Sequence, residues 1–269
     1  MLIRAGYDIR FDTDVPTPMM AMLSIHPSRH MDLTTPHRIV TTPEVPIYDY
    51  LDGFGNVCSR VTVPPGGLTL GCDFTIQDSG IADRYSPDAV QHRIEELPDD
   101  VLMYLLGSRY CETDRLLETA WSLFGHILPG WAKVQAISEF VHNHIEFGYH
   151  HARKTRTAWD AYQEQQGVCR DFAHLAVTLC RCVNIPARYC MGYLGDIGIP
   201  PVDAPMDFSA WFEVYLGGEW HTFDARHNSP RIGRILMARG RDATDTALTT
   251  TFGPAVLANF HVITDEVEP

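Results

Sequence analysis

Residues 167–175 read Gly167-Val168-Cys169-Arg170-Asp171-Phe172-Ala173-His174-Leu175, and they decide how the second half of the chain folds. Apolar residues recur at three- and four-residue spacing after the cysteine, a pattern that predicts a buried helix. Gly167 permits a tight turn, so Cys169 falls at or near the helix N-terminus. There the helix dipole and free backbone N–H groups favour a thiolate, the nucleophilic form of the side chain. The stretch therefore predicts a reactive cysteine, or in the alternative interpretation a small buried core residue.

The sequence on either side of this stretch predicts more helices and then a hairpin. Apolar spacing of about 3.6 residues predicts helices over 113–124 and 131–147. A short helix over 158–165 leads to Gly167. After the cysteine helix, 187–194 is expected to form a strand. The next two strands, 210–216 and 219–224, are expected to pair around Gly217-Gly218.

The first 90 residues have a different pattern. Apolar and polar residues alternate loosely, and Asp52-Gly53-Phe54-Gly55-Asn56 is typical of a hairpin turn between two strands. The polar, proline-containing segment 78–98 indicates a linker. We therefore expect an α+β protein, with an antiparallel β-sandwich-like domain over 1–90 and a core domain over 91–269.

The predicted hairpin fixes which side chains meet. If Gly217-Gly218 form the turn, Leu216 pairs with Glu219 and Asp224 lies opposite Trp211. Position 209 is then the diagonal neighbour of Asp224 on the same face, roughly 7–8 Å away between backbones. A carboxylate that orients a ring at position 209, beside a thiol brought up by the helix, would form an arrangement of nucleophile, base and orienter.

These stretches resemble the core of the bacterial transglutaminase-like superfamily. The resemblance rests on residues 167–175, on the strand 210–216 and on Thr222-Phe223-Asp224-Ala225-Arg226-His227-Asn228. Members are papain-like thiol enzymes whose triad runs Cys, His, Asp in chain order, and many bacterial members carry a small β domain before this core. The resemblance implies a papain-like core with Cys169 as nucleophile and Asp224 as orienter.

The sequence departs from the family pattern at position 209. The family has His-Ala-Trp where this chain has Ser209-Ala210-Trp211. A serine hydroxyl is not basic near neutral pH and is too short to bridge thiol and carboxylate, so it cannot act as the general base. His221 is expected on the opposite face from Asp224. His227 lies beyond the predicted strand end and would have to loop back, which leaves the base missing.

His174, five residues after the cysteine on the same helix, is expected to project away from its first turn. Three functions remain open for the catalytic positions Cys169, Ser209 and Asp224. The chain is a cysteine peptidase, amidase or acyl transferase that acts on a peptide or protein amide, inactive or impaired because of Ser209. Alternatively it is a degenerate, non-catalytic member that binds peptides or proteins. The third possibility is an engineered inactive variant of an active enzyme.

Composition excludes several other classes of function. The chain has 269 residues, of which 45% are hydrophobic and 20% charged, which is typical of a soluble globular protein. Its 21 basic and 34 acidic residues give a net charge of −13, which disfavours nucleic acid or an anionic membrane as a partner. No run of apolar residues is long enough for a transmembrane helix, and the N-terminus lacks the apolar region of a signal peptide. Seven cysteines without regular spacing favour a reducing cytoplasm.

No cofactor or metal site is expected. His142 and His144 lie two residues apart, so on a helix they do not face each other, and no cysteine or carboxylate completes a zinc site with them. The sequence gives no indication of the oligomeric state.

Overall fold

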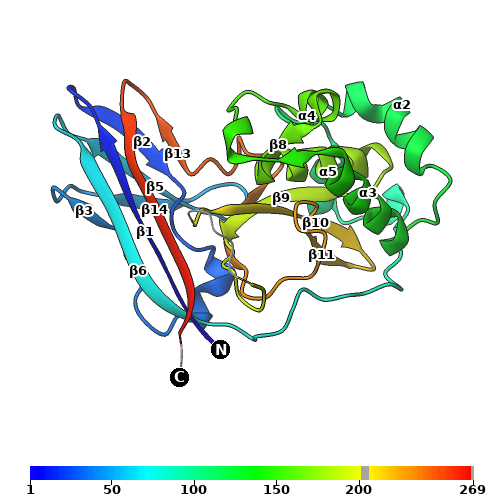
Figure 1. Ribbon diagram of the computed structural model, residues 1–269, viewed down its shortest axis with the longest axis horizontal. Coiled ribbons are helices and arrows are strands. Elements are labelled where there is room, and N and C mark those ends of the chain that lie inside the picture. The colour runs from blue at the N-terminus through cyan, green and yellow to red at the C-terminus, as the bar shows by residue number, and fades with distance from the viewer. Residues whose placement is uncertain (201–205, 268–269) are drawn as a thin grey trace.

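The computed structural model describes residues 1–200 and 206–267, which form two lobes side by side (Figure 1). One lobe is a sandwich of β-sheets, and the other combines helices with an antiparallel sheet. Both ends of the described chain lie in the sandwich lobe. Within these residues, no helix is long and apolar enough to span a membrane. The α+β fold class expected from the sequence is confirmed.

In the described part of the chain, the sandwich consists of two four-stranded sheets, ordered β14-β1-β6-β3 and β13-β2-β5-β4. Along β1, the buried side chains of Ile3, Ala5 and Ile9 alternate with exposed residues, so one face of the sheet packs inward. The strands are β1 (Leu2–Asp12), β2 (Thr17–Ala21), β3 (Val40–Thr42), β4 (Tyr48–Leu51), β5 (Val57–Val63), β6 (Leu68–Gln77), β13 (Thr249–Thr251) and β14 (Val256–Val267).

The sandwich takes strands from both ends of the chain. Strand β14 pairs with β1 along its length, from Val267 opposite Leu2 to Val256 opposite Asp12, and β13 pairs with β2. The sequence placed all residues after 90 in the core domain, but these last strands lie in the sandwich sheets. A long edge such as that of β1 exposes unpaired backbone groups, and β14 provides their partners.

The second lobe is organised around a sheet of order β11-β10-β9-β12 within the described residues. Helix α5 packs against this sheet, and every residue from Asp171 to Cys182 is buried. The strands are β7 (Glu146–Phe147), β8 (Gln166–Gly167), β9 (Ala187–Tyr193), β10 (Ser209–Leu216), β11 (Glu219–Phe223) and β12 (Ile235–Gly240). The α-helices are α1 (Asp99–Leu102), α2 (Thr113–Phe124), α3 (Trp131–His144), α4 (Ala158–Glu164) and α5 (Cys169–Cys182). Short 3₁₀ turns are η1 (Pro27–Asp32), η2 (Ile94–Glu96), η3 (Met103–Leu105) and η4 (Tyr149–His151).

The predicted helix over 131–147 ends earlier than expected, at His144. Residues 146–147 form β7 instead, because they pair in parallel with β8 directly before the cysteine helix. This pairing brings the end of α3 close to the start of α5.

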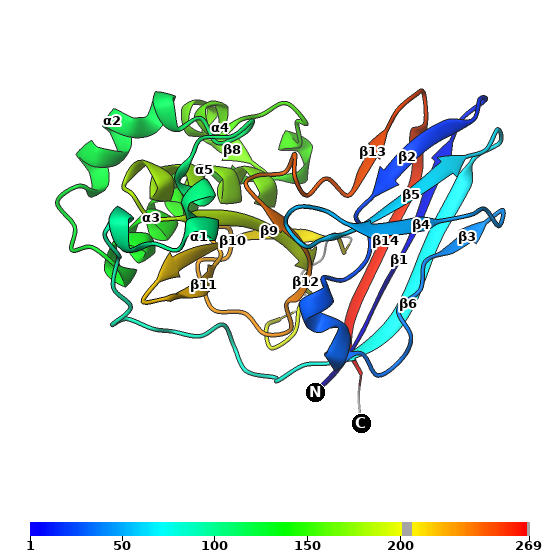
Figure 2. The same cartoon turned by 180° about the vertical axis from the view of Figure 1, so that it is seen from behind.

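The two lobes are joined by hydrogen bonds and by a shared apolar core. Strand β12 lies on the side of the core sheet nearest the sandwich (Figure 2). The side chain of Asn56 bonds the backbone of Arg239 in both directions, each at 2.9 Å. Tyr189 and Met191 of β9 belong to the same buried cluster as the sandwich core. The sheet against which the cysteine helix packs is therefore also fixed to the sandwich lobe.

Candidate active site

Helix α5 begins at Cys169 because of its neighbour Asp171. The Asp171 carboxylate is fully buried and accepts the backbone N–H of Val168 at 2.9 Å, which caps the first turn. A Cβ at position 167 would lie 2.7 Å from the Cβ of Asp171, so only glycine fits there without a shift. The cap therefore holds the cysteine at the first position of the helix, as the sequence predicted.

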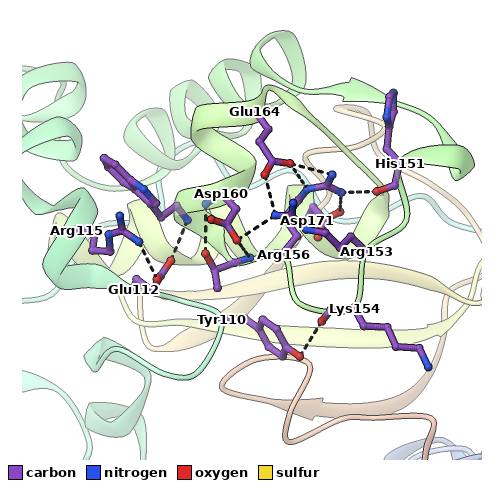
Figure 3. A network of polar contacts seen from close by, with 12 residues as sticks. Tyr110, Glu112, Arg115, His151, Arg153, Lys154, Arg156, Asp160, Glu164 and Asp171 are labelled. Atoms are coloured by element: carbon purple, nitrogen blue, oxygen red, sulfur yellow. Dashed lines mark hydrogen bonds and ion pairs between the residues drawn. The ribbon is translucent and has the colours of Figure 1, made fainter.

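A network of ion pairs holds this first turn in place (Figure 3). The buried guanidinium of Arg156 donates to Asp171 at 3.2 Å and contacts Glu164 of α4 at 3.0 Å. Glu164 also pairs with Arg153 at 2.8 Å, and Arg153 pairs with Asp160 at 3.1 Å. The loop before α4, the helix α4 and the start of α5 thus form one rigid support for Cys169.

Cys169 is the accessible cysteine of the chain. All seven cysteines lie within the described residues, and the other six are buried while Cys169 is partly exposed. Burial of its sulfur raises the pKa of Cys169 to about 11, although Arg226 and the backbone N–H of Ala210 both lower it. The sequence predicted that the helix N-terminus favours a thiolate, but burial has the largest effect on the pKa of this thiol and acts in the opposite direction. The thiol therefore needs a base to become a nucleophile.

The hairpin has the predicted register. Strands β10 and β11 pair from Leu216 opposite Glu219 to Phe212 opposite Phe223. Ser209 is the first residue of β10, and Asp224 follows β11 directly. Both side chains are buried, each residue 5% exposed. The Ser209 hydroxyl has no hydrogen-bond partner within residues 1–200 and 206–267.

The imidazole of His227 is hydrogen-bonded to the carboxylate of Asp224. Its Nδ1 lies 2.8 Å from Asp224 Oδ2, and its backbone N–H donates to Asp224 Oδ1 at 3.1 Å. The chain turns here because the backbone N–H of Asn228 donates to the Asp224 carbonyl at 2.7 Å and Asn228 adopts a left-handed φ of 47°. His227 therefore loops back to the site from beyond the strand end, which the sequence left open as an alternative.

A guanidinium also contacts the carboxylate of Asp224. Arg234 donates to Asp224 Oδ2 at 2.9 Å, and on its other side it bonds Asp83 from the segment between the lobes at 2.9 Å. Burial alone would raise the pKa of Asp224, but Arg234 and His227 outweigh it and hold that pKa well below its ordinary value. Asp224 therefore stays ionised and can orient the imidazole of His227.

Cys169, Ser209 and His227 line one cavity of about 150 Å³. Tyr149, Asp207 and Arg226 also line it. A cavity of this volume admits a group about the size of a benzene ring. Larger hollows of about 720 Å³ and 370 Å³ lie over the sandwich and beside Trp131, but neither Cys169 nor His227 lines them.

The remaining histidines considered from the sequence have other partners. His221 bonds the carbonyl of Leu216 at 3.1 Å, and the buried Nε2 of His174 accepts the backbone N–H of Ala243 at 3.1 Å. His142 bonds the carbonyl of Arg226 at 3.0 Å, and His144 bonds that of Tyr162 at 2.8 Å. In the described residues, no three His, Cys, Asp or Glu side chains are grouped so as to hold a metal ion.

His227 was the site residue that sequence reasoning did not select. The spacing Asp224-Ala225-Arg226-His227-Asn228 contains a usable signal, because an aspartate followed by a tight turn often accepts backbone N–H groups two or three residues on. Such a turn returns the side chain at the fourth position toward the carboxylate.

Comparisons with known proteins agree with this geometry. The family model of the transglutaminase-like superfamily matches residues 124–225. A crystal structure described as a "Putative Cysteine Protease" from Cytophaga hutchinsonii superposes with a TM-score of 0.82 at 30% identity, covering 100% of this chain and 91% of that one. An uncharacterized protein of Mycobacterium leprae (strain TN) is 35% identical over 94 residues. That match spans 33% of this chain and 32% of the relative.

The periplasmic domain of TgpA from Pseudomonas aeruginosa is a more distant match, with a TM-score of 0.39 and 13% identity over 80% of this chain and 89% of that one. The expected papain-type core is confirmed by the family match and by the structure from Cytophaga hutchinsonii. From the family match over residues 124–225 and the 30% identity to a structure that aligns with 100% of this chain, we conclude that the protein belongs to the transglutaminase-like superfamily.

Proposed function

We propose that this chain is an active thiol enzyme that cleaves amide bonds, with Cys169 as nucleophile, His227 as general base and Asp224 as orienter. The observation that carries the proposal is the 2.8 Å contact between His227 Nδ1 and Asp224, because His227 also lines the cavity that Cys169 lines. The sequence alone suggested an inactive or impaired site because Ser209 replaces the family histidine. A histidine from the next turn supplies the missing group.

The orientation of His227 suits a general base. Asp224 is ionised and accepts from Nδ1, so the proton of the neutral ring lies on Nδ1 and the lone pair on Nε2 is available. Nε2 makes no hydrogen bond within the part of the chain that the structure describes, and the ring lines the cavity with its side chain 22% exposed. The same carboxylate would stabilise the imidazolium once the ring takes a proton.

The reaction then follows in two steps. The thiol proton of Cys169 moves to His227 Nε2 as sulfur attacks the amide carbonyl carbon, and the π pair moves to the oxygen. The oxygen pair then re-forms the carbonyl, the C–N bond breaks, and the leaving nitrogen takes the proton from His227. Water or an amine, deprotonated by His227, attacks the resulting thioester and restores the thiol. Water gives a carboxylic acid, and an amine gives a new amide.

The raised pKa of Cys169 fits a mechanism that begins with a thiol rather than a standing thiolate. Free backbone N–H groups at the start of α5 stabilise the charge that forms on the carbonyl oxygen. We favour peptide hydrolysis over transfer to an amine, since the structure from Cytophaga hutchinsonii, which aligns with the whole chain, is described as a "Putative Cysteine Protease". No cofactor is required for either outcome.

The test is turnover of a panel of fluorogenic peptide amides, with and without a primary amine. The parent chain should act, and Cys169→Ala should abolish the activity. Loss of a triad base typically costs on the order of 10³–10⁶ in rate, and we expect His227→Ala to fall in this range. His126→Ala, at an exposed histidine outside the site, is the matched control and should keep the parent rate. If the parent is inactive on the whole panel, the alternative of a peptide- or protein-binding module replaces this proposal.

A further inference from the structure

We propose that Ser209 is a catalytic residue whose hydroxyl donates a hydrogen bond to the substrate carbonyl oxygen as that oxygen becomes an oxyanion. This inference rests on the proposed function of Cys169 and goes beyond it. The residue that made the site look incomplete would then have a role of its own in the reaction.

The hydroxyl of Ser209 is buried and has no partner among the described residues. Ser209 is only 5% exposed, yet its Oγ finds no hydrogen-bond partner in residues 1–200 and 206–267. Buried hydroxyl groups are nearly always hydrogen-bonded, because leaving them unpaired costs the desolvation of a polar group. An unpaired hydroxyl that lines a cavity is therefore available to a group that enters the cavity, and the cavity in question is the one that contains the nucleophile.

Ser209 is the residue of β10 next to the one that contacts the Cys169 sulfur. The backbone N–H of the next residue, Ala210, contacts the sulfur of Cys169 and lowers the pKa of the thiol. Ser209 itself pairs with Gly192 of β9, which fixes its backbone in the sheet. A carbonyl carbon bonded to the Cys169 sulfur would lie inside a cavity of about 150 Å³ that Ser209 also lines. In a cavity this small, we expect the carbonyl oxygen to lie within reach of the Ser209 side chain, because the next residue, Ala210, contacts the sulfur.

A small side chain suits position 209. The ring of His227 already occupies Oδ2 of Asp224, so a second ring at position 209 would compete for the same carboxylate. A serine leaves that space to the acyl group and replaces a base with a donor. Together with the backbone N–H of Cys169, the first residue of α5, it would supply two donors to one oxygen, which is the usual composition of an oxyanion hole.

In the proposed step, the hydroxyl keeps its proton throughout. The O–H of Ser209 donates while the carbonyl π pair resides on the oxygen, and the bond weakens again when the pair re-forms the carbonyl. Nothing is transferred to or from Ser209. Its removal should therefore slow only reactions in which an oxygen gains charge, and it should leave the reactivity of the sulfur itself unchanged.

Two small reagents separate these effects on the same cysteine. p-Nitrophenyl acetate acetylates Cys169 through attack on a carbonyl, and it releases p-nitrophenolate. Methyl iodide converts the thiol into a methyl thioether and releases iodide, so that no oxygen gains charge. Each rate is measured by intact-mass spectrometry on the full chain, with Cys169→Ala as background for other nucleophiles.

We expect Ser209→Ala to slow acetylation by about 10²–10³-fold, the cost of removing one oxyanion donor, and to leave S-methylation unchanged. Ser209→Thr, which keeps the hydroxyl, should recover part of the acetylation rate. Ser229→Ala, at an exposed serine, is the matched control and should change neither rate.

Two results would overturn the inference. Either acetylation in Ser209→Ala equals that of the parent, or both reactions slow in proportion, which would mean that Ser209 shapes the thiol and not the substrate. The comparison does not depend on peptide turnover. A chain that cleaves no amide but shows the selective loss would contradict the proposed function and leave the role of Ser209 standing, whereas His227→Ala tests the base separately.

Discussion

Replacement of Arg234 by methionine tests how the carboxylate of Asp224 is kept ionised. The Arg234 side chain is 8% exposed and that of Asp224 is 2% exposed, and their 2.9 Å contact continues to Asp83 at 2.9 Å. Methionine retains most of the apolar length of the arginine side chain while it removes the charge. The buried carboxylate of Asp224 then keeps its hydrogen bonds to the imidazole and backbone N–H of His227 but loses the guanidinium that contacts it.

The expected cost follows from this geometry. Breaking a buried ion pair by removing one partner typically destabilises a protein by about 3–5 kcal/mol, because the other charge stays buried without compensation. Domains are stable by only about 5–15 kcal/mol, so this is a large fraction of the total.

Urea denaturation of the parent and of Arg234→Met measures the loss of stability. Arg4→Met is the matched control, because its ion pair with Asp73 is exposed at 53% and 57% and exposed pairs contribute little to stability. The double variant Arg234→Met with Asp224→Asn should lose less than the sum of the two single variants. If Arg234→Met costs no more than Arg4→Met, the buried charge chain does not support the site as described.

Three further predictions follow from the structure. Gly167→Ala should destabilise the chain by roughly 1–3 kcal/mol in urea denaturation, because its Cβ would press against Asp171 at 2.7 Å. Cys169 should be the first cysteine modified by iodoacetamide in peptide mapping, since the other six are buried; earlier labelling of any other would contradict this. Burial lowers the pKa values of His26 and His37 from 6.5 to about 4. As the pH falls, both histidines are protonated in the unfolded chain at a higher pH than in the folded chain. The free energy of unfolding is therefore unaffected by them above pH 6.5, and it falls by about 1.4 kcal/mol per pH unit for each histidine as the pH drops toward 4. Denaturation curves at several pH values would measure that slope, and a flat profile would contradict it.

Local patterns in the sequence were sufficient for much of the core. The helix at Cys169 and the hairpin around Gly217-Gly218 are determined by apolar spacing and turn residues within a few positions of each other. Strand β14 could not be assigned in this way, because it pairs with β1 some 250 residues away and nothing local specifies that partner.

The candidate site was predictable in part for a related reason. Strand alternation gave the faces of positions 209 and 224, but it does not describe a chain after its strand has ended. The position of His227 depends on a turn in which Asp224 accepts backbone N–H groups from two residues, and the pKa of Cys169 depends on burial by distant segments. Both are tertiary effects that the local pattern does not contain.

The central claim is that His227 takes the place of a base at position 209, and a base exchange tests it most directly. The measurement is peptide-amide turnover by the parent, by His227→Ala and by Ser209→His combined with His227→Ala. The account predicts that the single variant loses at least about 10³-fold in rate and that the double variant regains a measurable part of it, because a ring at 209 can then use the vacated Asp224. Parent-level turnover by His227→Ala would contradict the account.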